Sequence, residues 1–94
     1  MASKRVLVID DDPDFLDYVT IVLSSNGYAV QTATSVAAGL DLMRAWMPHI
    51  VIADVMMSRT LEGSNICREM RADPVLCAIP LILVSAIVSD DDEA

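Results

Sequence analysis

Short apolar runs alternate along the chain with longer segments in which apolar residues recur every three or four positions. The apolar runs are rich in β-branched residues, as buried strands are, and they cover residues 6–9, 28–32, 49–53 and 80–85. The longer segments have the periodicity of amphipathic helices, and they cover residues 13–25, 35–47 and 64–71. The sequence therefore predicts strands and helices in alternation.

Capping residues mark several of the predicted helix ends. Asp12 is suited to cap a helix that begins at Pro13, and Asn26-Gly27 ends that helix. A threonine or serine at 34–35 opens the second helix, and Pro48 closes it. Strands that alternate with helices form a parallel sheet with right-handed crossovers and helices on both faces. We therefore expect an α/β fold.

Length and charge limit the possible functions. The chain has 94 residues, of which 54% are hydrophobic, so we expect one small domain over residues 1–94 and exclude a two-domain enzyme. A formal net charge of −8 disfavours a nucleic-acid interface and favours metals or basic protein faces as partners. We expect the acidic residues 90–94 to form a flexible tail, the alternative being the start of a further helix.

The sequence also indicates where the protein resides. No apolar run reaches the roughly 18–20 residues that a membrane helix needs, and the N-terminus does not resemble a secretory signal. Cys67 and Cys77 do not form a CxxC pair, so we interpret them as free thiols in a reducing compartment. We expect a cytoplasmic protein that does not bind membranes.

Polar side chains cluster where the predicted strands end. Asp10 and Asp11 follow the first strand, Asp54 follows the third, and Ser85 ends the fourth. In open α/β sheets, ligands bind outside the carboxyl ends of the strands. We therefore expect these four residues to lie at one edge of the sheet. The alternative interpretation is that the acids only end strands and cap helices, as aspartates commonly do.

Carboxylates gathered at one edge repel one another, and a divalent cation relieves that repulsion. Ligand sets of oxygen atoms without histidine or thiolate favour Mg²⁺ or Mn²⁺, and Mg²⁺ often contacts a phosphate as well. The three glycines, Gly27, Gly39 and Gly63, are too scattered to form a nucleotide-binding loop. A carboxylate can itself accept a phosphoryl group, and Asp54 is the best placed to do so.

Three segments, 7–13, 49–57 and 79–86, together resemble the receiver domain of two-component response regulators in sequence, order and spacing. They read LVIDDDP, HIVIADVMM and IPLILVSA. The resemblance covers nearly the whole chain, from residue 4 to about residue 92. It implies a flavodoxin-like, doubly wound parallel sheet, with strand order 2-1-3-4 for the strands present here and no fifth strand or last helices.

The resemblance also implies the ligands of a metal ion. Asp10 and Asp11 would be the acidic pair that holds Mg²⁺, Asp54 would be a third ligand, and Met56 would contribute its backbone carbonyl.

The same resemblance implies a phosphorylation site. Asp54 would accept a phosphoryl group from the phosphohistidine of a histidine kinase. The Ser85 hydroxyl would bond the new phosphoryl group and report its presence, with the Ala86 amide beside it. The chain would then be a substrate and switch in a phosphorelay rather than an enzyme.

The chain departs from the family pattern near its end. The family has a lysine on a fifth strand, whereas the one lysine here, Lys4, precedes the first strand and belongs to the opposite end of the sheet. We therefore expect the phosphoryl group to be stabilised less than in family members that have this lysine. With strand order 2-1-3-4, the apolar strand at 81–84 becomes an edge, so we expect self-association through that edge or by exchange of the C-terminal part, or else poor solubility.

Two further functions compete with this interpretation. One is an interaction module that binds a kinase or another partner through the first helix without useful phosphorylation, which the missing lysine favours. The other is a Mg²⁺-dependent phosphatase of the aspartyl-phosphate type. That chemistry needs a second acid two residues after the nucleophile, where this chain has Met56. No DNA-binding segment is expected in these residues.

Overall fold

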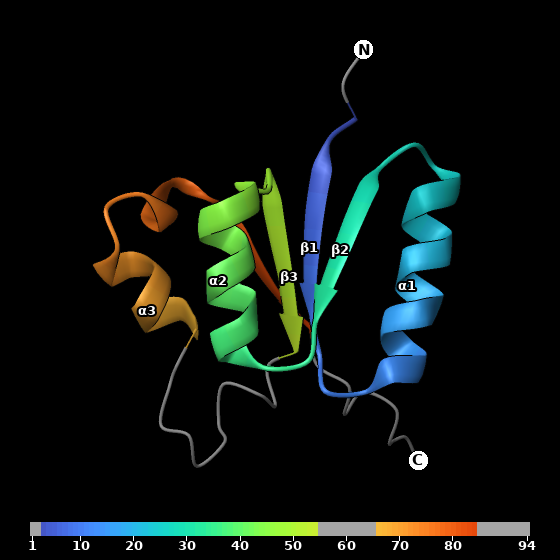
Figure 1. Cartoon of the computed structure of the whole chain (residues 1–94), viewed down its shortest axis with the longest axis horizontal. Coiled ribbons are helices and arrows are strands. Elements are labelled where there is room, and N and C mark those ends of the chain that lie inside the picture. Colours follow the sequence, from blue (N-terminus) through green and yellow to red (C-terminus); the bar gives the residue numbers. More distant parts are fainter. Residues whose placement is uncertain (1–2, 55–65, 85–94) are drawn as a thin grey trace.

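The computed structural model describes residues 3–54 and 66–84, and Figure 1 shows the whole chain. Four strands, three α-helices and one short 3₁₀ helix make up the described part. In chain order they are β1 (Arg5–Ile9), α1 (Pro13–Ser25), β2 (Ala29–Ala33), α2 (Val36–Trp46), β3 (Ile50–Asp54), α3 (Ile66–Ala72), the 3₁₀ helix η2 (Leu76–Ala78) and β4 (Leu81–Val84).

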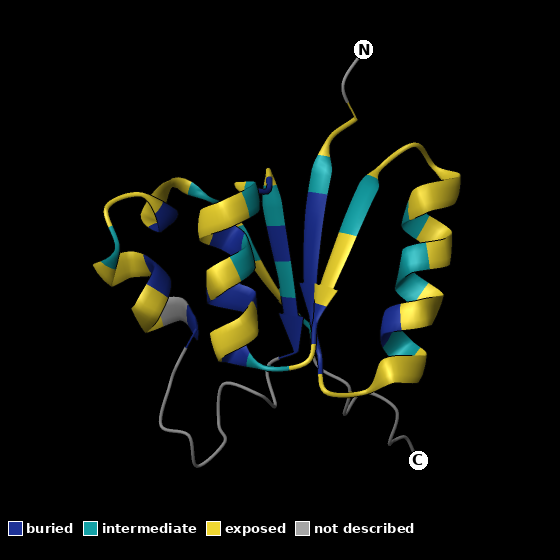
Figure 2. Ribbon diagram, viewed as in Figure 1, coloured by how far each residue is buried: buried dark blue, intermediate teal, exposed yellow. Residues whose placement is uncertain are grey.

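The four strands form one parallel sheet in the order β2-β1-β3-β4. This confirms the predicted α/β fold and strand order. β1 and β3 occupy the middle of the sheet and are the most deeply buried strands (Figure 2). They therefore read as continuous apolar runs in the sequence, as central parallel strands do.

Two apolar layers cover the two faces of the sheet. Successive side chains of a strand point to opposite faces of the sheet, so alternate residues of β1 pack into different layers. Leu7 and Ile9 join the layer under α2 and α3, whereas Val6 and Val8 pack against Leu16 of α1. Figure 1 shows α1 on its own side of the sheet, separate from α2 and α3.

The predicted boundaries differ from the observed ones by a residue or two. β2 and β3 begin and end one residue later than predicted, and α3 begins at Ile66, since residues 64 and 65 lie outside the described part. β4 excludes Pro80, whose carbonyl nevertheless accepts a hydrogen bond from the Val51 N–H at 3.0 Å. The 3₁₀ helix η2 was not predicted from the sequence. None of the described helices is both long and apolar enough to cross a bilayer.

One carboxylate organises the connection from α3 to β4. Asp73 accepts hydrogen bonds from the Val75 and Leu76 N–H groups at 2.8 and 3.3 Å, and from Arg44 Nε at 3.3 Å. The Val75 N–H lowers the pKa of Asp73 most, and the Leu76 N–H and the Arg44 guanidinium lower it further. Asp73 thereby starts η2 and links it to α2.

Arg5 ties together three segments at the amino end of the sheet. Its guanidinium donates to the Met47 carbonyl at 2.8 and 3.1 Å and lies 6.0 Å from the centre of the Trp46 ring. Met47 ends α2 in the left-handed conformation, with φ of 53°. His49 Nδ1 accepts the Arg5 N–H at 2.9 Å, and the His49 N–H donates to the Arg5 carbonyl at 2.8 Å. His49 thus has a structural role, far from the acidic edge.

Gly39 lets α2 approach β1 closely. A Cβ atom at this position would lie 2.9 Å from Ile9 Cγ1 and closer still to Ile9 Cδ1, and Ile9 is fully buried. Alanine is otherwise preferred to glycine inside a helix by about 1 kcal/mol. The close approach of α2 to β1 therefore explains why glycine, and not alanine, stands at position 39.

We predict that Gly39→Ala destabilises the protein, because the overpacking penalty of about 1–3 kcal/mol exceeds the gain in helix propensity. Ile9→Val alone should cost about 0.5–1.5 kcal/mol. The double variant should lose less than the sum, since removal of Cδ1 makes room for the new methyl group. Urea unfolding followed by circular dichroism measures all four free energies. Additive losses would contradict the steric explanation.

Candidate functional site

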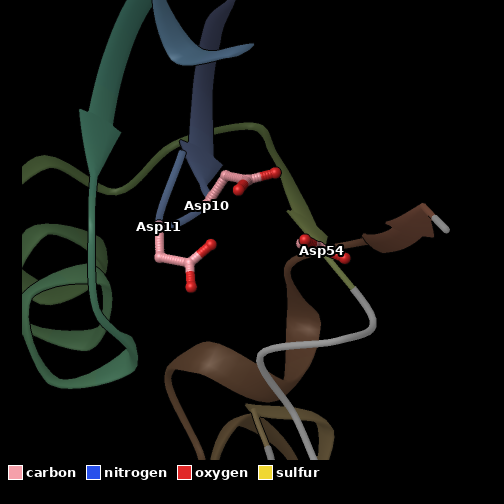
Figure 3. A group of neighbouring side chains, drawn as sticks. All are labelled: Asp10, Asp11 and Asp54. Carbon is pink, nitrogen blue, oxygen red and sulfur yellow. The ribbon is translucent and has the colours of Figure 1, made fainter. Parts of the chain in front are cut away.

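The pairing of β1 with β3 brings two aspartates together at the carboxyl edge of the sheet. Ile9 pairs with Ala53, and the next residues along the two strands are Asp10 and Asp54. Asp11 follows in the turn that leads to α1. Figure 3 shows the three side chains around the ends of the two strands, with the Asp10 carboxyl group directed toward the β3 side.

The three carboxylates are close enough to share one ion. One oxygen from each of them lies within 4.8 Å of the others, and this is the one such group of metal-ligating side chains in the described part of the chain. Asp10 and Asp54 are only 5% and 6% exposed, whereas Asp11 is exposed. No other charged side chain among the described residues is buried to this extent.

Main-chain hydrogen bonds fix the turn that carries Asp10. The Asp10 N–H donates to the Ala33 carbonyl of β2 at 3.0 Å. Asp10 Oδ1 accepts the N–H of Asp12 at 2.9 Å, and Asp12 Oδ1 accepts the N–H of Asp14 at 3.0 Å. Asp12 was predicted only as a helix cap, and the contribution of its backbone amide was not predicted. An aspartate side chain commonly accepts the backbone N–H two residues later, so Asp10 just after a strand is itself a signal for such a turn.

Burial raises the pKa of Asp10, and the negative charges of Asp54 and Asp11 raise it further. The hydrogen bond from the Asp12 N–H acts in the opposite direction and is outweighed. The ionised form of Asp10 is therefore disfavoured in the absence of a cation. A bound cation would reverse this effect, because a nearby positive charge favours the charged form of Asp10.

The ligand set fits Mg²⁺. All three candidate ligands are carboxylates, and hard oxygen ligands suit Mg²⁺ better than zinc, which prefers nitrogen and sulfur. Oxygens bound to one Mg²⁺ at about 2.1 Å lie at most about 4.2 Å apart, so the carboxylates need only a small adjustment. One exposed carboxylate, Asp11, leaves the site open to solvent and to a phosphate oxygen.

The structure thus brings Asp10, Asp11 and Asp54 together, as the sequence predicted. Three further predicted site residues, Met56, Ser85 and Ala86, lie outside the described residues. Val84, which precedes Ser85 in the sequence, pairs with Asp54 in the sheet.

Comparison with known proteins identifies the family. The profile of the response regulator receiver domain matches residues 6–94. This chain belongs to the response regulator receiver-domain family. Two curated relatives are similar to it: the "DNA-binding dual master transcriptional regulator RpaA" of Synechocystis, 33% identical over 89 residues, and the "DNA-binding response regulator MtrA" of Mycolicibacterium smegmatis, 31% identical over 83 residues.

These matches cover 95% and 88% of the receiver chain but only 36% and 35% of the two relatives. The receiver chain therefore spans about a third of the curated proteins that it resembles.

Solved structures agree on the fold. The N-terminal domain of a response regulator receiver protein from Methanoculleus marisnigri superposes with a TM-score of 0.79 at 28% identity, covering 87% of the receiver chain and 66% of that chain. The chemotaxis response regulator CheY4 of Vibrio cholerae superposes with a TM-score of 0.77 at 22% identity, covering 87% and 68%. The flavodoxin-like architecture predicted from the sequence is confirmed.

We predict that Asp10→Asn stabilises the metal-free protein at neutral pH, because it removes a charge that burial disfavours while an oxygen remains to accept the Asp12 N–H. A gain of about 1 kcal/mol corresponds to about 4–8 °C in a domain of this size. Folded Asp10 binds its proton at a higher pH than unfolded Asp10, so the advantage of the variant should shrink as the pH falls through the raised pKa.

Thermal unfolding with a chelator tests this prediction, and Asp17→Asn is the control, because it removes the same charge from an exposed position on α1. Addition of Mg²⁺ should stabilise the wild-type protein and the control more than Asp10→Asn. Equal stability of the wild-type protein and Asp10→Asn without metal would show that the buried charge is not costly.

Proposed function

We propose that this receiver domain accepts a phosphoryl group on Asp54 from a histidine kinase, with Mg²⁺ as the cofactor. One observation carries the proposal: two buried carboxylates, Asp10 and Asp54, meet a third, Asp11, at the carboxyl edge of the sheet. Buried charges are costly, and they are retained where they bind ions or react. Membership of the receiver-domain family supports the same function.

The side chains of Asp10, Asp11 and Asp54, together with the Met56 backbone carbonyl, are the proposed ligands. When bound, Mg²⁺ supplies positive charge that neutralises the ligands and the transferring phosphoryl group. The Asp10 carboxylate is held by the Asp12 N–H, so its position is set before the ion arrives. The short, hydrogen-bonded turn limits the reorganisation that binding requires.

Asp54 is the proposed nucleophile. One carboxylate oxygen attacks the phosphorus of a kinase phosphohistidine in line, so that an O–P bond forms as the P–N bond breaks. The electron pair of the broken bond stays on the imidazole nitrogen, and Asp54 becomes an acyl phosphate. The domain contributes mainly position and electrostatics, as in other phosphoryl transfers. It acts as a substrate and switch, not as an enzyme that turns over.

Ser85 and Ala86 complete the proposed site. The Ser85 hydroxyl and the Ala86 amide are proposed to donate hydrogen bonds to the phosphoryl oxygens. The pairing of Val84 with Asp54 supports this assignment, because Ser85 follows Val84 directly in the sequence. We further propose that the protein works in the cytoplasm and does not bind nucleic acid or membranes through these residues. A net charge of −8 supports the absence of nucleic-acid binding, because it repels the phosphate backbone.

An interaction module is the second candidate function. The first helix exposes large apolar side chains, with Tyr18 66% and Ile21 67% exposed. Such residues favour contact with a partner. The sole lysine, Lys4, lies just before β1 and therefore at the end of the sheet away from Asp54. Under this alternative the domain binds a kinase or another partner through α1 without efficient phosphorylation.

Phosphorylation is tested by the intact mass of the protein after incubation with acetyl phosphate and Mg²⁺. We expect a gain of one phosphoryl group in the wild-type protein and in Asp17→Asn, and no gain in Asp54→Asn or in the presence of EDTA. No gain in a folded wild-type protein that binds Mg²⁺ would contradict the phosphoacceptor function and favour the interaction module.

We also propose that the 94-residue chain associates with a second copy through β4, or by exchange of its C-terminal part. β4 lies at the edge of the described sheet, and Ile82 and Leu83 on its two faces are 45% and 41% exposed. The Pro80 carbonyl accepts a hydrogen bond from the Val51 N–H, so the backbone groups of Pro80 point toward β3. Backbone groups of successive residues in a strand point to alternate sides. The N–H and C=O groups of Leu81 and Leu83 therefore point away from β3 and are available to a second strand. Antiparallel pairing of two β4 strands would keep the two acidic edges apart.

Sedimentation velocity over a range of concentrations tests the association. We expect a concentration-dependent dimer, and we expect Ile82→Lys to shift the equilibrium toward monomer, because charge on an edge strand opposes pairing. Ala45→Lys, at an exposed position on α2, is the control for the added charge. A compact wild-type monomer at all concentrations would contradict the proposal.

A further inference from the structure

Asp12 links the metal ligand Asp10 to the start of α1. Its backbone N–H donates to Asp10 Oδ1 at 2.9 Å, and its carbonyl accepts the Leu16 N–H at 3.1 Å. Its side chain caps the helix, since Oδ1 accepts the Asp14 N–H at 3.0 Å. These three hydrogen bonds of Asp12 connect the Asp10 carboxylate to the turn and to the first turn of α1.

The cap determines where the Asp12 amide lies. The capping hydrogen bond closes a small ring over residues 12–14, and Pro13 restricts the backbone within it. The helix that follows is anchored by Leu16, which is buried against Val6 and Val8 of β1. The position of the amide is therefore set by a packed element of structure.

The amide in turn orients the Asp10 carboxyl group. A terminal carboxyl group has a broad torsional preference of its own, so a directed hydrogen bond is needed to hold it. The N–H of Asp12 occupies one lone pair of Oδ1 and limits rotation of the group, whose other lone pairs remain available to a cation. Asp12 itself does not belong to the three-carboxylate group.

We propose that Asp12 is a positioning residue for the metal site, acting through its helix cap and its backbone amide and not as a ligand. The inference rests on the proposed function, in which Asp10 binds Mg²⁺. Groups that orient metal ligands typically change metal affinity by about 10–100-fold when they are removed. The effect here is expected near the lower end, because the hydrogen bond itself comes from the backbone and persists in part.

Two substitutions separate the cap from the charge of Asp12. Asp12→Ala and Asp12→Asn both remove one negative charge, but only asparagine retains an oxygen that caps the helix well. Their Mg²⁺ dissociation constants are to be compared by isothermal titration calorimetry with the full chain. We expect Asp12→Ala to bind about tenfold more weakly than Asp12→Asn. Equal affinities would overturn the inference.

Ser35→Ala controls for a general loss of stability. Ser35 caps α2 by accepting the Ala38 N–H at 3.1 Å, and α2 follows β2 rather than β1. Its loss should lower the melting temperature about as much as loss of the Asp12 cap, since either cap contributes roughly 0.5–2 kcal/mol. We expect the Mg²⁺ affinity of Ser35→Ala to equal that of the wild type. A decrease like that of Asp12→Ala would overturn the inference.

Amide hydrogen exchange gives a readout without metal. In Asp12→Ala the amide of residue 12 should exchange faster than in Asp12→Asn, whereas the amides of β3 should be unaffected. Unchanged exchange at residue 12 would overturn the inference while leaving the proposed function intact. A wild-type protein that does not bind Mg²⁺ would instead contradict both, so the two failures are distinguishable.

Discussion

The parallel pairing of β1 with β3 is the constraint on which the rest of the site depends. It fixes Ile9 beside Ala53, so the residues that follow, Asp10 and Asp54, must emerge together at the carboxyl edge of the sheet. A shift of the register by one residue would turn every side chain of one strand to the opposite face and would separate the acids. The apolar layers on both faces resist such a shift, because they bury alternate residues of β1. Packing of the core therefore fixes the relative positions of Asp10 and Asp54.

The same arrangement makes the site costly to keep without a cation. Burial and mutual repulsion raise the pKa of Asp10, and the hydrogen bond from Asp12 compensates only partly. Ionised Asp10 therefore lowers the free energy of unfolding of the metal-free protein. Cation binding reverses this cost, which couples the folding of the domain to the occupancy of the site. A marginal domain of this size would respond strongly to that coupling.

Much of the fold could be read from the sequence because buried parallel strands are continuous apolar runs, and aspartates mark where two of them end. The three-residue helix η2 was missed, since a single turn has no periodicity. The second function of Asp12 was missed for a different reason: a backbone amide has the same chemistry in every residue, and only the turn geometry directs it at Asp10. The left-handed conformation of Met47 was also not predicted, because residues in that conformation at helix ends are usually glycine.

The position of the single tryptophan has a consequence for spectroscopy. Trp46 lies beside Arg5 at the start of β1, whereas Asp10 follows the end of the same strand, about 16 Å away at the usual rise of a strand. The indole therefore contacts none of the three carboxylates. Its fluorescence should report unfolding with little interference from ion binding, which gives the domain a built-in optical reference for its folded state.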